Sequence, residues 1–333
     1  SIEGLRSTTE DRWLGNLDVG LWLDADLGPS LGLDAWHLFV NPTFVGGDEE
    51  GGSTRTRLYQ AWLSWSGESN REAQVGLLDL TWHFHSLPSA APFVRLPTGT
   101  GAEFSPGSLG LLDLFPLSAP TVRGEVRTST PNGESYVQAA FTQLTAGHEL
   151  HGRALFDEAT AWQRSLVIVE FGQRHSGTAE AGWRHRHFGI GTWRLPTHPH
   201  TWGTYAFADF ALSREAALDG QGLSAFLSGS VARADGFEIE ERVVVGFSYE
   251  GLLPRRDEDV TAFALLVERR GAELNEEKLE EPIRQAWEFT HRYRLTEHLA
   301  LQGTLQWQYG LNDEDHPTET REGRVGLRLI FEY

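Results

Sequence analysis

Residues 324–333 read Arg-Val-Gly-Leu-Arg-Leu-Ile-Phe-Glu-Tyr, with apolar side chains at every second position from Val325 onward. Successive side chains of a β-strand point to opposite faces, so this spacing predicts a strand with one apolar face. That face consists of Val325, Leu327, Leu329, Phe331 and Tyr333. A closed barrel pairs its last strand with its first, so a strand at the end of the chain is expected for a β-barrel.

The same two-residue alternation recurs along the chain and predicts the other strands. Its apolar sets include Leu17, Val19, Leu21 and Leu23; Tyr59, Ala61, Leu63 and Trp65; Val122 and Val126; Val243, Val245 and Phe247; Trp287, Phe289 and Tyr293; and Leu301, Leu305 and Trp307. Charged and amide side chains fill the positions between them. Turn signals such as Pro-Asn-Gly at 131–133 separate the runs. Helical periodicity is scarce, so we predict an all-β protein.

Composition narrows the function classes. The chain has 333 residues, 28 Lys+Arg against 47 Asp+Glu, and a formal net charge of −19, which argues against nucleic-acid binding. There is no cysteine, and therefore no disulfide, cysteine-based zinc site or thiol nucleophile. No run of about 18 apolar residues predicts a transmembrane helix. A membrane barrel remains open, because alternation keeps its mean hydropathy low. Ser1 in place of Met is expected if a signal peptide has been removed.

Chain length sets the size of the predicted barrel. About 16 strands of about 9–11 residues each take roughly half of the sequence and leave the rest for loops. We predict a single transmembrane antiparallel β-barrel domain over residues 1–333. Residues 86–120, rich in Pro, Gly and Ser, are predicted to fold into the lumen as a constriction loop, with a surface loop as the alternative. Residues 271–282 are predicted to form a charged loop or a short helix.

A soluble β-sandwich is the alternative interpretation of the alternation. Its inner faces would be mostly aliphatic and its polar faces would contact bulk water. Here the polar faces mix Trp, Arg, Glu and Gln, as a wet lumen does. The apolar faces carry aromatic residues towards strand ends, as the interfacial girdles of a membrane barrel do. The pattern therefore favours the membrane barrel.

Several short segments, none of which is a specific motif by itself, follow one another in a distinctive order. They are residues 57–63, 75–79, 116–123, 136–140, 167–170, 203–215, 221–226, 249–254 with 259–260, 305–307 and 326–329. Their order and spacing over residues 12–333 resemble the OprB-type carbohydrate-selective porin family of bacterial outer-membrane β-barrels. The chain departs from the family pattern at Gln60, Phe210 and Gly303. These departures concern the chemistry of the constriction and the preferred sugar.

The resemblance implies an eyelet narrowed by inward loops and lined by charged and aromatic side chains. The pore-lining candidates are Arg57, Gln60, Trp62, Asp79, Trp82, Arg95, Arg123, Arg127, Glu170 and Asp209. The expected function is passive, sugar-selective diffusion through a water-filled lumen in the outer membrane of a Gram-negative bacterium. Expected partners are small sugars, outer-membrane lipid and lipopolysaccharide, the barrel-assembly machinery through the C-terminal strand, and in an oligomer further copies of the chain.

The residue types suit sugar passage on physical grounds. An arginine on the lipid face at mid-depth costs about 2–4 kcal/mol, so charged members of each alternation are expected to face the lumen. Sugar hydroxyls donate and accept hydrogen bonds, and Arg, Glu, Asp and Gln can replace their water one bond at a time. Aromatic faces stack on the C–H face of a pyranose. The alternative for each charged residue is a salt bridge that only stiffens the lumen wall.

Other functions have weaker signals. Pairs such as His83/His85 and His185/His187 have the spacing to share a metal ion on a strand, but no third ligand follows at a fixed distance. We therefore predict no metal site and no cofactor. No Walker or His-Glu-x-x-His motif occurs, and we predict no catalytic residue. A barrel hydrolase that uses His and Asp stays open as a minor alternative. The main alternative is a blocked barrel with a structural or polysaccharide export or assembly role.

Overall fold

The computed structural model describes most of the chain. The described residues are 2–7, 13–20, 23–28, 35–47, 55–67, 70–93, 118–131, 133–143, 165–175, 186–196, 200–214, 221–233, 239–270, 283–313 and 316–331. Within them lie 17 strands and two 3-10 helices. The strands are β1 Ile2–Ser7, β2 Trp13–Gly20, β3 Leu23–Asp26, β4 Trp36–Gly47, β5 Arg55–Gly67, β6 Arg71–Leu78, β7 Ala119–Thr130, β8 Gly133–Gln143, β9 Ser165–His175, β10 Arg186–Arg194, β11 Trp202–Arg214, β12 Gly222–Arg233, β13 Ile239–Glu250, β14 Val260–Arg270, β15 Ile283–Thr296, β16 Leu299–Asp313 and β17 His316–Phe331. The short helices are η1 Leu80–Trp82 and η2 Pro88–Ala90.

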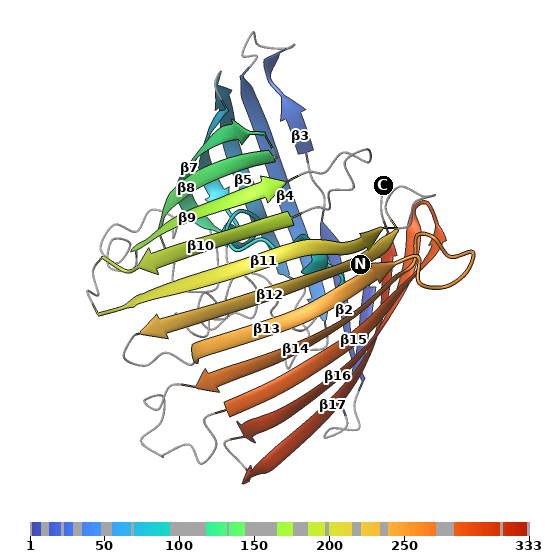
Figure 1. Ribbon diagram of the computed structural model, residues 1–333. Coiled ribbons are helices and arrows are strands. Elements are labelled where there is room, and N and C mark those ends of the chain that lie inside the picture. Colours follow the sequence, from blue (N-terminus) through green and yellow to red (C-terminus); the bar gives the residue numbers. More distant parts are fainter. Residues whose placement is uncertain are drawn as a thin grey trace.

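All strands belong to one antiparallel sheet in which, apart from β2 and β3, each strand pairs with its neighbour in sequence (Figure 1). β1 pairs with both β17 and β2, so the pairing order returns to its start. β2 and β3 both pair with β4, at successive stretches of that strand, and thus form one interrupted strand. Counted this way, the described residues provide 16 strand positions, as the sequence predicts. The fold is an all-β, antiparallel transmembrane barrel.

The two faces of the sheet are inverted relative to a soluble protein. On β7, Val122 is 57% exposed whereas the next residue, Arg123, is 3% exposed. The same contrast recurs on later strands: Phe171 is 54% exposed beside Glu170 at 0%, and Val243 is 51% exposed beside Arg242 at 3%. An apolar exterior around a polar interior is the arrangement that a lipid-embedded barrel requires. None of the helices in the described ranges has the length and apolar character needed to cross a membrane.

Large aromatic rings cover inward-facing glycines on the β8–β13 part of the inner wall. In each case ring and glycine are directly paired across neighbouring strands: Tyr136 with Gly172, Phe207 with Gly189, Tyr205 with Gly191, Trp193 with Gly203, and Phe226 with Gly246. A Cβ added to these glycines would lie 2.2 to 2.7 Å from the ring atoms. Glycine is needed at these positions because the ring occupies the place of a side chain.

Residues 79–93, which we call the inward segment, connect β6 towards β7 and pack against this aromatic wall. Phe84, Leu87 and Ala90 of the segment are buried in one cluster with Tyr205, Phe207, Trp193, Phe226, Leu166, Ile168 and Leu266 of the strands. The imidazole of His85 stacks on the ring of Tyr205, with centroids 4.6 Å apart and planes at 11°. The beginning of the predicted 86–120 loop therefore lies against the inner face of the sheet; its residues 94–117 are outside the described ranges.

Candidate functional site

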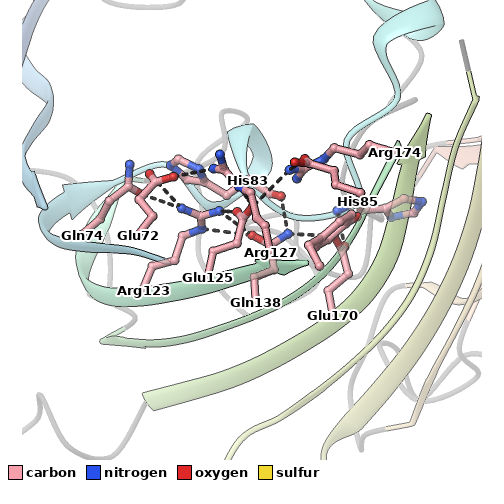
Figure 2. Close-up of polar contacts among 12 residues, drawn as sticks. Glu72, Gln74, His83, His85, Arg123, Glu125, Arg127, Gln138, Glu170 and Arg174 are labelled. Atoms are coloured by element: carbon pink, nitrogen blue, oxygen red, sulfur yellow. Dashed lines mark hydrogen bonds and ion pairs between the residues drawn. The ribbon is translucent and has the colours of Figure 1, made fainter. Parts of the chain in front are cut away.

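Arg123 of β7 is the centre of an ion network on the inner wall (Figure 2). Its guanidinium donates to Gln138 Oε1 at 2.7 and 3.0 Å, to Gln74 Oε1 at 3.1 Å and to Glu72 at 3.3 Å. It also contacts the carboxylate of Glu125, two residues along the same strand. Arg123 is thus almost enclosed by protein acceptors, and it orients the side chains around it.

The outer members of the network are partly open to solvent. Arg127 donates to Glu72 at 2.6 Å and to Glu125 at 2.5 Å. Arg174 of β9 donates to Glu125 at 3.0 Å and to Glu134 at 3.4 Å. Arg127 is 35% exposed, Arg174 31% and Glu72 21%, whereas Glu125 is 1% exposed. The exposed members can reach a passing solute, and the buried ones hold them in place.

The network carries no net charge. Three arginines (Arg123, Arg127, Arg174) face three carboxylates (Glu72, Glu125, Glu134), and we call these six residues the ion cluster. Desolvation by burial, helped by the positive charge of Arg123, lowers the pKa of nearby His83 to about 3, so this imidazole is neutral at ordinary pH.

A cavity of about 400 Å³ opens beside the ion cluster. It is lined by Glu72, Arg123, Glu125, Arg127 and Arg174 together with Trp82, His83, Ser86, Pro88 and His187. This volume falls in the range of small-molecule sites, about 300–1,000 Å³. Aromatic, cationic and anionic groups therefore meet around one water-accessible space.

Glu170 of β9 fastens the inward segment to the wall. Its carboxylate accepts the backbone N–H of His85 at 2.7 Å, the hydroxyls of Tyr205 at 2.7 Å and Tyr136 at 2.9 Å, and the amide of Gln138 at 2.7 Å. The side chain is fully buried. A buried carboxylate is tolerated only when donors satisfy it, and here four neutral donors do so.

Asp209 of β11 makes a second attachment. It accepts the backbone N–H of Ser89 at 2.7 Å and the Ser89 hydroxyl at 2.6 Å. On the opposite wall, the Gln302 amide of β16 donates to the carbonyl of Pro92 at 2.5 Å. The inward segment therefore crosses from β9 and β11 to β16, within the ring of strands.

The other sequence-predicted candidates lie in several environments. Asp79 is buried and accepts from Thr81 N and Thr81 Oγ1, both at 2.8 Å, and from the Tyr59 hydroxyl, so it caps η1. Trp62 stacks on Phe39, with centroids 5.0 Å apart. Three further candidates are Gln60, which is fully buried on β5, Arg57, whose side chain is not described, and Arg95, which is outside the described residues.

The structure thus brings Arg123, Arg127 and Trp82 to the cavity, and it places Glu170, Asp209 and Asp79 in the attachment of the inward segment. Sequence reasoning did not select Glu72 or Arg174, and it predicted only an inward direction for Glu125. Each is the polar member of a strand alternation, and that signal marks an inward direction without distinguishing depth or neighbours. In the described residues no group of three or more His, Asp or Glu side chains could hold a metal ion.

The fold of this chain is similar to the folds of solved porin structures. No protein-family model and no curated protein matches the chain. Among solved structures, the high-pH structure of Pseudomonas putida OprB matches with a TM-score of 0.79 and 15% identity, covering 99% of this chain and 91% of that chain. The low-pH structure of the same protein matches with a TM-score of 0.63 and 13% identity, covering 98% and 88%. A mutant porin of Rhodopseudomonas blastica matches with a TM-score of 0.54 and 11% identity, covering 99% of both chains. The likeness is one of fold.

Proposed function

We propose that this chain is an outer-membrane porin that gives passive, sugar-selective passage to small neutral carbohydrates. The observation that carries the proposal is a charge-balanced, water-accessible cavity inside a barrel whose exterior is apolar. Arg127 and Glu72 offer a donor and an acceptor to the same solute, 2.6 Å apart. A neutral polyol can exchange bonds with both, whereas an ion is attracted by one partner and repelled by the other.

The inward segment supports the proposal because it narrows the lumen. Its attachment to Glu170, Asp209 and Gln302 fixes a rigid obstacle across the barrel. We infer that it begins the constriction loop of residues 86–120. A fixed eyelet selects solutes by size and by hydrogen bonding, and weak individual bonds allow release.

Loop lengths support an orientation. One rim carries the short turns 131–132 and 297–298, and the opposite rim carries the long connections 79–118 and 144–164. In outer-membrane barrels the short turns face the periplasm and the long loops face outwards. We therefore infer that the inward segment enters from the external side. Lipid and lipopolysaccharide would contact the apolar exterior. The barrel-assembly machinery would recognise strand β17.

Liposome swelling tests the proposal. The purified protein is reconstituted and swelling is recorded in isosmotic glucose, a disaccharide, a trisaccharide and potassium gluconate. We expect rates that fall steeply with sugar size and a slower rate for gluconate than for glucose. Absence of swelling in every sugar, with correctly inserted protein, would contradict the proposal and favour a blocked barrel with a structural or export role.

A further inference from the structure

Three side chains on the outer face of the barrel form a row across neighbouring strands. Arg194 of β10 is paired with Trp202 of β11, and Trp202 is paired with Arg233 of β12. All three side chains are exposed, and Trp202 is exposed by 42%. Their chain neighbours Trp193 and Ala232 are each 1% exposed and belong to the inner wall, so the row points away from the lumen. We call these three residues the rim row.

The rim row lies at the edge of the sheet that carries the long connections. Arg194 ends β10 and Arg233 ends β12, whereas Trp202 begins β11. Figure 1 shows these three strand ends at one edge of the sheet. On the other side of β10, Arg194 is paired with Val167, close to the start of β9 and to the long connection 144–164. In the orientation inferred above, this edge faces the external leaflet of the membrane.

Two arginines in one row of a lipid-facing surface indicate an anionic partner. An arginine on the outer face of a barrel is costly at the midplane of the bilayer and is tolerated near the interface, where these strand ends lie. Trp202 indicates the same depth, because tryptophan is enriched at membrane–water interfaces. Guanidinium groups bind phosphate oxygens through paired hydrogen bonds. Phosphate groups are therefore the lipid components that the two arginines would bind.

The spacing of the rim row suits a ligand with two phosphates. Neighbouring strands lie about 4.8 Å apart, so the backbones of Arg194 and Arg233 are about 10 Å apart, with Trp202 between them. The strands that follow carry an outward-facing ion pair, in which Arg269 Nη2 lies 2.6 Å from Glu241 Oε1. Because the two charges of that pair cancel, it does not offset the two positive charges of the row.

We propose that the rim row binds the phosphorylated disaccharide headgroup of lipopolysaccharide in the external leaflet. Arg194 and Arg233 each bind one of its two phosphates, and Trp202 contacts the disaccharide that separates them. Phosphatidylglycerol, with a single phosphodiester, can engage only one of the two arginines. The proposal rests on the outer-membrane location and the orientation inferred above, and it does not depend on sugar passage.

Native mass spectrometry of the full chain in detergent tests the proposal, with diphosphorylated lipid A as the probe. Wild-type protein is expected to bind one molecule. The double variant Arg194→Gln, Arg233→Gln should bind it about tenfold or more weakly, because it loses hydrogen bonds between charged groups. Arg186→Gln is the matched control: Arg186 is an exposed arginine on the same face of β10, at the opposite rim, and its replacement should leave binding unchanged.

Three results would each overturn the site. They are equal binding by the double variant, equal binding of phosphatidylglycerol by wild-type protein, and displacement of lipid A by an equal concentration of inorganic phosphate. Heat-modifiable electrophoretic mobility verifies that the variants are folded. Should the double variant not fold, wild-type protein with monophosphorylated lipid A decides: weaker binding than that of the diphosphorylated lipid supports the site, and equal binding overturns it.

Glucose-driven swelling, measured on the same wild-type preparation, separates this site from the porin function. Swelling without lipid A binding means that the site fails and the porin function stands. Lipid A binding without swelling means that the porin function fails and the site stands.

Discussion

The carboxylate of Glu170 accepts the backbone N–H of His85 at 2.7 Å, and this bond joins the middle of the barrel wall to a segment 85 residues earlier. Three side-chain donors, from Tyr136, Gln138 and Tyr205, complete the shell of the same carboxylate. An acidic residue that the sequence suggests as a sugar ligand is therefore saturated by the protein itself. Its location makes it a determinant of loop position.

Glu170→Ala is expected to free the inward segment while leaving the barrel folded. The variant leaves four buried donors without their acceptor, at a cost of about 1–3 kcal/mol for each one that finds no substitute. Single-channel recordings should show larger and noisier conductance than wild type. Glu297→Ala in the β15–β16 turn is the control, since Glu297 is 85% exposed and lies outside the ion cluster. Equal, quiet conductance in both variants would contradict the attachment.

Gly172→Ala is expected to destabilise the wall, because its Cβ would lie 2.3 Å from the Tyr136 hydroxyl oxygen. Displacing that ring disturbs its bond to Glu170, and overpacking of this kind costs about 1–3 kcal/mol. Gly124→Ala on β7 is matched to it, since nothing lies within 4 Å of an added Cβ there. The temperature of the heat-modifiable mobility shift measures the difference: it should fall for Gly172→Ala and stay at the wild-type value for Gly124→Ala. A fall of equal size in both would count against the ring-over-glycine packing.

Glu72→Gln is expected to shift the channel towards anions. The substitution removes one of the three carboxylates that balance the arginines of the ion cluster and leaves Arg127 with Glu125 alone. The reversal potential under a salt gradient should move in the anion-selective direction, more strongly at low than at high ionic strength. Glu258→Gln, an exposed carboxylate in the β13–β14 turn, provides the comparison and should change little. A shift towards cations would disprove the charge balance.

Stability is expected to fall with acid because of His85. Desolvation by burial, with a contribution from Arg242, lowers the pKa of His85 to about 3 from its ordinary value of 6.5. Between these two values the unfolded chain binds a proton that the folded chain does not, so stability is complete above pH 6.5 and decreases as pH falls towards 3. His85→Gln should flatten this part of the profile, measured as unfolding temperature against pH. His298→Gln in the β15–β16 turn is the exposed control.

The strands were predictable from the sequence because side-chain direction in a strand depends only on position parity. Alternation around Val122 and Arg123 predicts which faces outwards, and the structure confirms it. The sequence suggested Glu170 and Asp209 as pore-lining residues, but it did not reveal their hydrogen-bond partners. These partners, His85 and Ser89, are 85 and 120 residues away in the sequence. The alternation of side chains along the strands gives no information on which segment of the chain crosses the lumen. The interruption between β2 and β3 was not predicted either, since the alternation continues through it.

The central claim is that lipid surrounds this barrel and that water reaches its middle. Because the chain contains no cysteine, single-cysteine variants report each position without background. Ser86→Cys lines the cavity and Val245→Cys lies on the outer face. In reconstituted protein, a charged, membrane-impermeant thiol reagent should modify Ser86→Cys, lowering its conductance in steps, and should leave Val245→Cys unmodified. Rapid modification of Val245→Cys together with protection of Ser86→Cys would contradict the account.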